Sequence, residues 1–198
     1  MQNKEYTQKV FISISIFLIL LLGVVIVFAI QLNNQNTVFK TILTADTEVS
    51  EASISGQKAL DFYTEASLSY EKTDYNLVES NCRLARGYFS DTSQKYKDIG
   101  SGLESSGIDD KLVDIYVEEM NLLAEIQWNM YEACEHFESA SRYYNTYYNT
   151  NVPSGDVSYD MGGQEIEAMN EKIDLHDQNI RKYNDLLSDY TIELKKRL

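Results

Sequence analysis

Apolar residues recur at alternating spacings of three and four along most of the chain after residue 32. This pattern places one apolar residue per turn on the same face of a helix and is typical of helices packed in coiled-coil fashion. Four such runs predict helices at about 33–70, 74–106, 109–150 and 163–198. We therefore expect an all-α fold with a long antiparallel up-down-up-down four-helix bundle over residues 33–198.

The apolar faces of the predicted helices differ in residue size. The first face is mostly small, with alanines at positions 45, 52, 59 and 66, so a neighbouring backbone can approach it closely. The second face is formed by Val78, Cys82, Ala85, Phe89, Thr92, Tyr96, Ile99 and Leu103. The third face is formed by Leu112, Tyr116, Met120, Leu123, Ile126, Met130, Cys134, Phe137, Ser141 and Tyr144. The fourth face is formed by Ile166, Met169, Ile173, His176, Ile180, Tyr183, Leu187, Tyr190 and Leu194.

Short polar or glycine-containing segments separate these helices. The segment Lys72-Thr73-Asp74 predicts the first turn, with Asp74 as the N-cap of the second helix. Gly107 predicts a left-handed residue after the second helix, and Asp109 is expected to cap the third. Residues 149–163 contain the only proline of the chain and predict its one long loop.

A longer apolar run lies near the N-terminus. Residues 10–30 are 21 residues without a charged side chain. At a rise of about 1.5 Å per residue the run spans about 31 Å, which matches the hydrocarbon core of a bilayer. A cleaved signal peptide is the alternative, but its apolar region usually has about 7–15 residues. We therefore expect an uncleaved signal anchor, with one transmembrane helix over residues 10–32.

The charges that flank this run predict its orientation. Lys4 and Lys9 precede it, whereas Lys40 follows it together with Asp46 and Glu48. Positively charged residues favour the cytoplasmic side of a membrane. We expect a single-pass protein of the cell membrane, with residues 1–9 as a cytoplasmic tail and residues 33–198 as an extracytoplasmic domain.

Composition limits the possible functions. The net charge of −14 argues against a nucleic-acid partner, because phosphate binding needs a basic surface. Two histidines and two cysteines offer few ligands for a metal centre, so we expect no metal and no cofactor. The sequence has no phosphate-binding glycine loop, nucleophile elbow or zinc-protease helix, so we expect no enzymatic activity and assign no catalytic residue.

Tyrosines gather where the third predicted helix ends and the long loop follows. They are Tyr143, Tyr144, Tyr147, Tyr148 and Tyr159. In an up-down-up-down bundle on an N-terminal anchor, this region lies at the end distal to the membrane. Tyrosine-rich surfaces suit protein contacts, so these residues are candidates for binding a partner. The alternative is that some of the rings pack the end of the bundle and the others are solvated.

Two basic groups are further candidates. Arg83, Arg86 and Arg142 could bind a small anionic ligand. The alternative interpretation is helical ion pairing, since Glu79–Arg83 and Glu138–Arg142 are both spaced by four residues. At the C-terminus, residues 195–197 (Lys195, Lys196 and Arg197) end a helix that returns to the membrane, where they could contact lipid headgroups.

The two cysteines predict a disulfide. Cys82 and Cys134 lie at nearly equal distances along the chain from the turn between the second and third helices. Antiparallel helices rise equally per residue, so the two side chains are expected level with each other on facing seams. Disulfides persist outside the cytoplasm, and we expect a Cys82–Cys134 bond, with two buried free thiols as the alternative.

Two classes of function remain. The first is a non-enzymatic accessory or interaction subunit of an envelope or membrane assembly, with membrane lipid and a protein as its partners. The second is a ligand-binding sensor bundle that works through a separate signalling partner. The layout of anchor and bundle is similar to that of the extracytoplasmic four-helix sensor domains of chemoreceptor-type proteins, although no second apolar run of membrane length follows.

Overall fold

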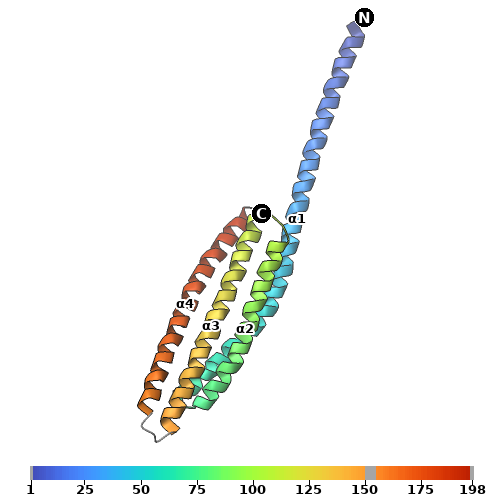
Figure 1. Cartoon of the computed structure of the whole chain (residues 1–198). Helices are drawn as coiled ribbons and strands as arrows, with labels where there is room; N and C mark the ends of the chain where they lie inside the picture. Colours follow the sequence, from blue (N-terminus) through green and yellow to red (C-terminus); the bar gives the residue numbers. More distant parts are fainter. Residues whose placement is uncertain (1, 150–154, 197–198) are drawn as a thin grey trace. The chain divides into compact units, whose positions relative to one another are not determined.

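The computed structural model describes the backbone of residues 2–149 and 155–196, and the side chains of residues 32–149 and 157–196. Four helices account for nearly all of the described chain: α1 (Gln2–Glu71), α2 (Tyr75–Ser105), α3 (Lys111–Asn149) and α4 (Gly155–Lys195) (Figure 1). No strand occurs among these residues. The all-α class predicted from the sequence is confirmed.

The chain divides into two compact units, Met1–Thr41 and Ile42–Leu198. The first unit is the N-terminal part of α1. The second contains the rest of α1 together with α2, α3 and α4, which run alongside one another as the predicted four-helix bundle (Figure 1). Short turns join α1 to α2 and α2 to α3, so consecutive helices run in opposite directions.

The turn between α1 and α2 lies where the sequence predicted it. Thr73 adopts a left-handed backbone conformation, with a φ of 59°. The side chain of Asp74 accepts a hydrogen bond of 3.2 Å from the backbone N–H of Leu77. Asp74 is therefore the N-cap of α2, because it satisfies one of the free N–H groups at the start of the helix.

The turn between α2 and α3 matches the prediction in part. Gly107 has a φ of 65°, the left-handed conformation expected of the residue that follows a helix. The capping side chain of α3, however, is that of Asp110, whose carboxylate accepts a hydrogen bond of 2.9 Å from Leu112 N–H. The prediction of Asp109 as the cap is wrong by one residue, because α3 begins at Lys111.

Two predicted helix starts also differ from the structure. The helix expected from residue 33 is continuous with the preceding segment, since α1 begins at Gln2. α4 begins at Gly155 and not at residue 163, so the predicted loop is shorter. Glycine lowers helix stability by only about 1 kcal/mol per residue, and the packing of Gly162 against Tyr144 favours the helical conformation there.

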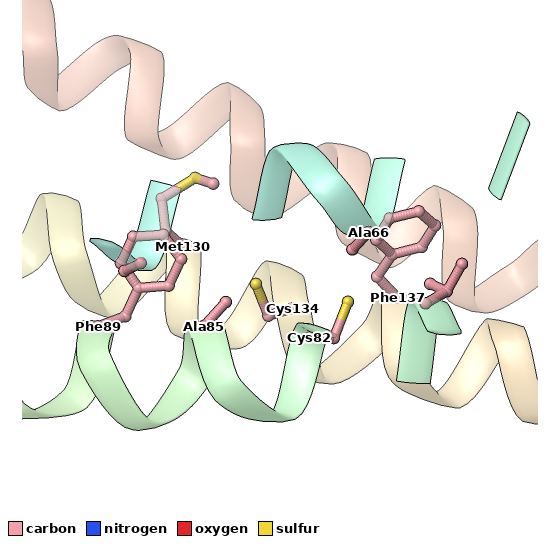
Figure 2. Packing of buried hydrophobic residues seen from close by; sticks show 9 residues of the cluster. Ala66, Cys82, Ala85, Phe89, Met130, Cys134 and Phe137 are labelled. Carbon is pink, nitrogen blue, oxygen red and sulfur yellow. The ribbon is translucent and has the colours of Figure 1, made fainter. Parts of the chain in front are cut away.

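α2 and α3 contribute most of the buried residues that the structure describes. All eight residues predicted for the apolar face of α2 are buried, and on α3 only Leu123 of the predicted face is not. The large side chains Phe89, Met130 and Phe137 pack against Ala59 and Ala66 of α1 (Figure 2). The small face of α1 thus admits the larger side chains of its neighbours, as its composition predicted.

α4 is less buried than the other bundle helices. Among its described residues only Gly162 and Asn179 are buried, and most of its predicted apolar face is half-buried. Leu187 is exposed, so its assignment to that face is wrong. Polar contacts attach α4 to α3 along its length: His136–Glu165 (2.6 Å), Lys172–Glu132 (2.9 Å), Asn179–Glu125 (3.2 Å) and Lys111–Glu193 (3.3 Å).

The predicted membrane anchor lies almost wholly outside the residues whose side chains the structure describes. Its backbone is helical and belongs to α1. Within residues 32–149 and 157–196, no helix combines the length and the apolar character needed to cross a bilayer.

The two cysteines lie side by side on α2 and α3, and both point into the core (Figure 2). Both are fully buried free thiols, so the predicted disulfide is absent from the structure, although the predicted register is confirmed. Helix axes pack about 8–10 Å apart, whereas a disulfide requires its two Cα atoms to lie about 4.4–6.8 Å apart. A hydrogen bond to Cys82 and burial both raise the pKa of the Cys134 thiol, so it stays protonated and unreactive.

We predict that neither thiol reacts with a maleimide in the folded protein, because both are buried. After denaturation without a reductant, both Cys82 and Cys134 should be labelled. Intact mass spectrometry counts the labels directly. Denatured protein that takes up no label and lacks two hydrogen atoms in mass would instead show an oxidised pair.

Candidate partner-binding surface

The fold brings tyrosines from all four helices to one end of the bundle. These residues, which we call the tyrosine cluster, are Tyr70 of α1, Tyr75 of α2, Tyr144, Tyr147 and Tyr148 of α3, and Tyr159 of α4. The end of α1, the start of α2, the end of α3 and the start of α4 meet there because the helices alternate in direction. The cluster therefore depends on the topology of the bundle.

Tyr144 is the centre of the tyrosine cluster. Its buried ring lies 6.1 Å from the ring centroid of Tyr70, 5.7 Å from that of Tyr75 and 5.5 Å from that of Tyr159. The ring of Tyr70 also contacts Phe137, which belongs to the core, at 5.3 Å. Tilted and edge-on aromatic pairs each contribute about 0.5–1.5 kcal/mol beyond their area burial. The inner rings thus continue the core to the end of the bundle.

Of the outer rings of the cluster, Tyr148 and Tyr159 are exposed and Tyr147 is half-buried. Tyr148 stacks on Tyr75 with 5.8 Å between centroids, and Tyr147 contacts both Tyr148 at 4.9 Å and Tyr159 at 5.0 Å. Tyr148 remains 60% exposed and Tyr159 48% exposed. Rings held in place by ring contacts but open to solvent lose little conformational entropy on binding, which suits them to a protein interface.

The phenol groups of Tyr70, Tyr75 and Tyr144 remain neutral at physiological pH. Burial is the main cause that raises the pKa of each, and neighbouring phenols add to the increase for Tyr70 and Tyr75. For Tyr144 burial outweighs a hydrogen bond with Tyr70 that acts to lower the pKa. Beside them, Asn145 donates a hydrogen bond of 3.0 Å to Asn76. Amide groups therefore lie next to the aromatic rings at this end of the bundle.

Four of the five tyrosines singled out in the sequence belong to the cluster. Tyr143 does not, because it lies about 100° around α3 from Tyr144, where it is half-buried. Sequence reasoning missed Tyr70 and Tyr75. The sequence did indicate their position, because both residues flank the turn at residues 72–74. The predicted topology places that turn at the same end of the bundle as the other tyrosines.

Gly162 of α4 packs directly against the ring of Tyr144. A Cβ atom at Gly162 would lie 2.8 Å from Cε1 of Tyr144, closer than side chains tolerate. At the neighbouring Gly163 a Cβ atom would meet nothing within 4 Å. Gly162 thus allows α4 to approach the cluster, whereas Gly163 has no such role.

The pair provides a matched test of this packing. We predict that Gly162→Ala lowers the free energy of unfolding by about 1–3 kcal/mol, because the methyl group displaces a buried ring. Gly163→Ala should raise it by about 0.5–1 kcal/mol, because alanine favours the helix. Denaturant titration of both variants measures the difference. Equal stabilisation by both substitutions would show that Tyr144 does not pack on Gly162.

The three candidate arginines converge on one carboxylate. Glu138 is only 4% exposed. It lies 2.9 Å from Arg86, 3.5 Å from Arg83 and 3.6 Å from Arg142. Arg83 also contacts Glu79 at 2.7 Å, so both ion pairs with four-residue spacing are present as the alternative interpretation predicted.

Arg86 is the least exposed of the three arginines in this network. It contacts Glu135 at 2.9 Å and donates a hydrogen bond of 2.8 Å to the hydroxyl of Tyr131. Its guanidinium also lies 4.7 Å from the centroid of the Tyr131 ring. The hydrogen bonds to Tyr131 and Glu138 raise the pKa of Arg86, although burial opposes them. Because carboxylates already pair with these arginines, binding of an anionic ligand stays a prediction with no support from this geometry.

We predict that Glu138→Gln lowers the free energy of unfolding by about 1.5–3 kcal/mol. The substitution removes the negative charge that accepts two part-buried hydrogen bonds, from Arg83 and Arg86, and pairs with Arg142. Glu135→Gln is the matched control and should cost less than about 1 kcal/mol, because that carboxylate is exposed and contacts one arginine. Thermal or denaturant unfolding compares them. An equal loss of stability in both variants would show that the three arginines around Glu138 do not make its charge more stabilising than that of Glu135.

The basic C-terminal segment is described only in part. Lys195 is in the last turn of α4, where a positive charge complements the helix dipole. Lys196 lies 3.1 Å from Glu193, and Arg197 is outside the described residues. Hydrogen bonds from Lys196 and Lys111 lower the pKa of Glu193. Contact of this segment with lipid headgroups stays a prediction.

Within residues 32–149 and 157–196, no three histidine, cysteine or acidic side chains are grouped so that they could hold a metal ion. Comparisons of the chain with protein-family models, with curated proteins and with solved structures find no match. The tyrosine cluster is therefore the candidate functional surface on its geometry alone.

Proposed function

We propose that this protein is a non-enzymatic accessory subunit of a membrane or envelope assembly. In this proposal residues 10–32 anchor it in the cell membrane, and the bundle stands outside the cytoplasm. The exposed face of the tyrosine cluster contacts a protein partner. The observation that carries the proposal is that rings from all four helices gather at one end of the bundle and hold one another by mutual contacts, while Tyr148 and Tyr159 remain exposed.

Two further features support a binding role. Val157 and Met161 of α4 are exposed close to Tyr159 in sequence, which adds apolar side chains to the aromatic ones. Exposed apolar groups that lie together on an otherwise acidic protein are typical of interaction sites. The apolar run at residues 10–30, preceded by Lys4 and Lys9, supports the anchor and its orientation.

Cross-linking in native membranes tests the proposal. A photoreactive residue placed at Tyr148 should give a discrete cross-linked product with another protein. The same residue at Trp128 is the control, because Trp128 is also an exposed, stacked aromatic residue but lies in the middle of α3. We predict that Tyr159→Ala weakens the product obtained from position 148, because it removes a neighbouring ring of the same surface.

Two results would contradict the proposal. Equal cross-linking from positions 148 and 128 would mean that the tyrosine cluster has no preferred partner. Release of the protein from membranes by an alkaline wash would contradict the proposed transmembrane anchor, because a transmembrane helix resists such extraction.

A further inference from the structure

A buried acidic site lies in the half of the bundle opposite the tyrosine cluster. The side chain of Glu119 on α3 is 4% exposed, and its Oε1 atom has no hydrogen-bond partner among the described residues. One turn earlier on α3, the hydroxyl of Tyr116 donates a hydrogen bond to the carboxylate of Asp46 on α1. Two acidic side chains from different helices are therefore close to each other in the bundle.

Among the described residues, the titratable groups that interact with Glu119 are a carboxylate and three phenols. Asp46 faces it from α1 and Tyr116 from its own helix. Tyr183 and Tyr190 face it from α4, and Tyr190 lies 6.1 Å from the ring of Tyr116. From α2, Tyr96 lies beside Tyr183. A carboxyl group in such surroundings is more stable when it carries its proton.

Burial, together with the charge of Asp46, raises the pKa of Glu119 to about 7. The group therefore holds its proton in the folded bundle at pH values where an exposed glutamate has lost it. Because its pKa is raised on folding, Glu119 gives its full contribution to stability below about pH 4.5. That contribution decreases as the pH rises and is lost above about pH 7.

The helix that covers Glu119 buries the fewest residues of the four among those that the structure describes. α4 buries only Gly162 and Asn179 among its described residues, and Tyr183 and Tyr190 are half-buried. Half-buried apolar side chains and partly exposed polar pairs supply the rest of its attachment to α3. Segments with few buried apolar contacts open at low free energy, without unfolding the rest of a protein.

We propose that Glu119 is a proton-dependent switch that controls the docking of the C-terminal half of α4, residues 176–195, on the bundle. With Glu119 protonated, Tyr183 and Tyr190 cover it and this half of α4 is docked. When Glu119 ionises, the buried charge beside Asp46 requires water, and this half of α4 detaches to admit it. The packed seam between α2 and α3 stays intact in both states.

Hydrogen exchange of the full-length, detergent-solubilised protein tests the proposal. Protection factors, corrected for the intrinsic pH dependence of exchange, are compared between about pH 5 and about pH 8.5. For residues 176–195 we expect protection to fall by about tenfold or more, while protection of α2 and α3 changes little. An equal fall in all helices, or no fall in α4, would overturn the proposal.

Two variants assign the effect to Glu119. Glu119→Gln cannot ionise, so its protection in residues 176–195 should not depend on pH. Glu118→Gln is the matched control, because Glu118 is the adjacent residue and is exposed, and it should behave like the unaltered protein. If Glu119→Gln retains the fall of the unaltered protein, the switch does not reside in this side chain.

If Glu119→Gln does not fold, a further variant tests whether ionisation of Glu119 controls the docking of α4. Asp46→Asn removes the neighbouring negative charge but leaves Glu119 able to ionise. Its loss of protection should therefore occur at lower pH than in the unaltered protein, because one of the two causes of the raised pKa is gone. An unchanged midpoint would overturn the proposal.

Discussion

The packing of α2 against α3 is the constraint on which the rest of the bundle depends. The two helices bury nearly complete apolar seams against each other, and the two cysteines, level and fully buried, lie in that seam. α1 can join this pair closely because its face carries alanines where its neighbours carry Phe89 and Phe137. Large side chains thus come from the central pair, and small ones come from the helix that packs on it.

α4 is attached to the bundle by different contacts from those of the other helices. Its apolar face is half-buried, and ion pairs and an amide contact attach it to α3. Such surface pairs contribute little individually, whereas a buried apolar side chain contributes about 1.5–3 kcal/mol. The stability of the bundle is therefore uneven, with a firm hairpin of α2 and α3 and a weaker fourth helix. This unevenness leaves α4 free to respond to a change in buried charge.

The two ends of the bundle have different chemistry because antiparallel helices alternate the chain direction. At one end, rings from all four helices continue the core outward as the tyrosine cluster, and Gly162 provides the space that its central ring needs. Toward the other end, the tyrosines that pack between the helices surround the carboxyl groups of Glu119 and Asp46. Aromatic contact dominates the first site, and burial of charge dominates the second.

The sequence by itself determined the helical class, the seams of α2 and α3, the Asp74 cap and the left-handed Gly107, because each follows from local spacing or from one residue's backbone preference. It also placed Cys82 level with Cys134, because helical rise is constant. The sequence could not determine that the two thiols remain free, or that three arginines meet on Glu138. Nor could it show that Glu119 lies buried beside Asp46. These depend on the distance and rotation between helices far apart in the chain, which only tertiary packing decides.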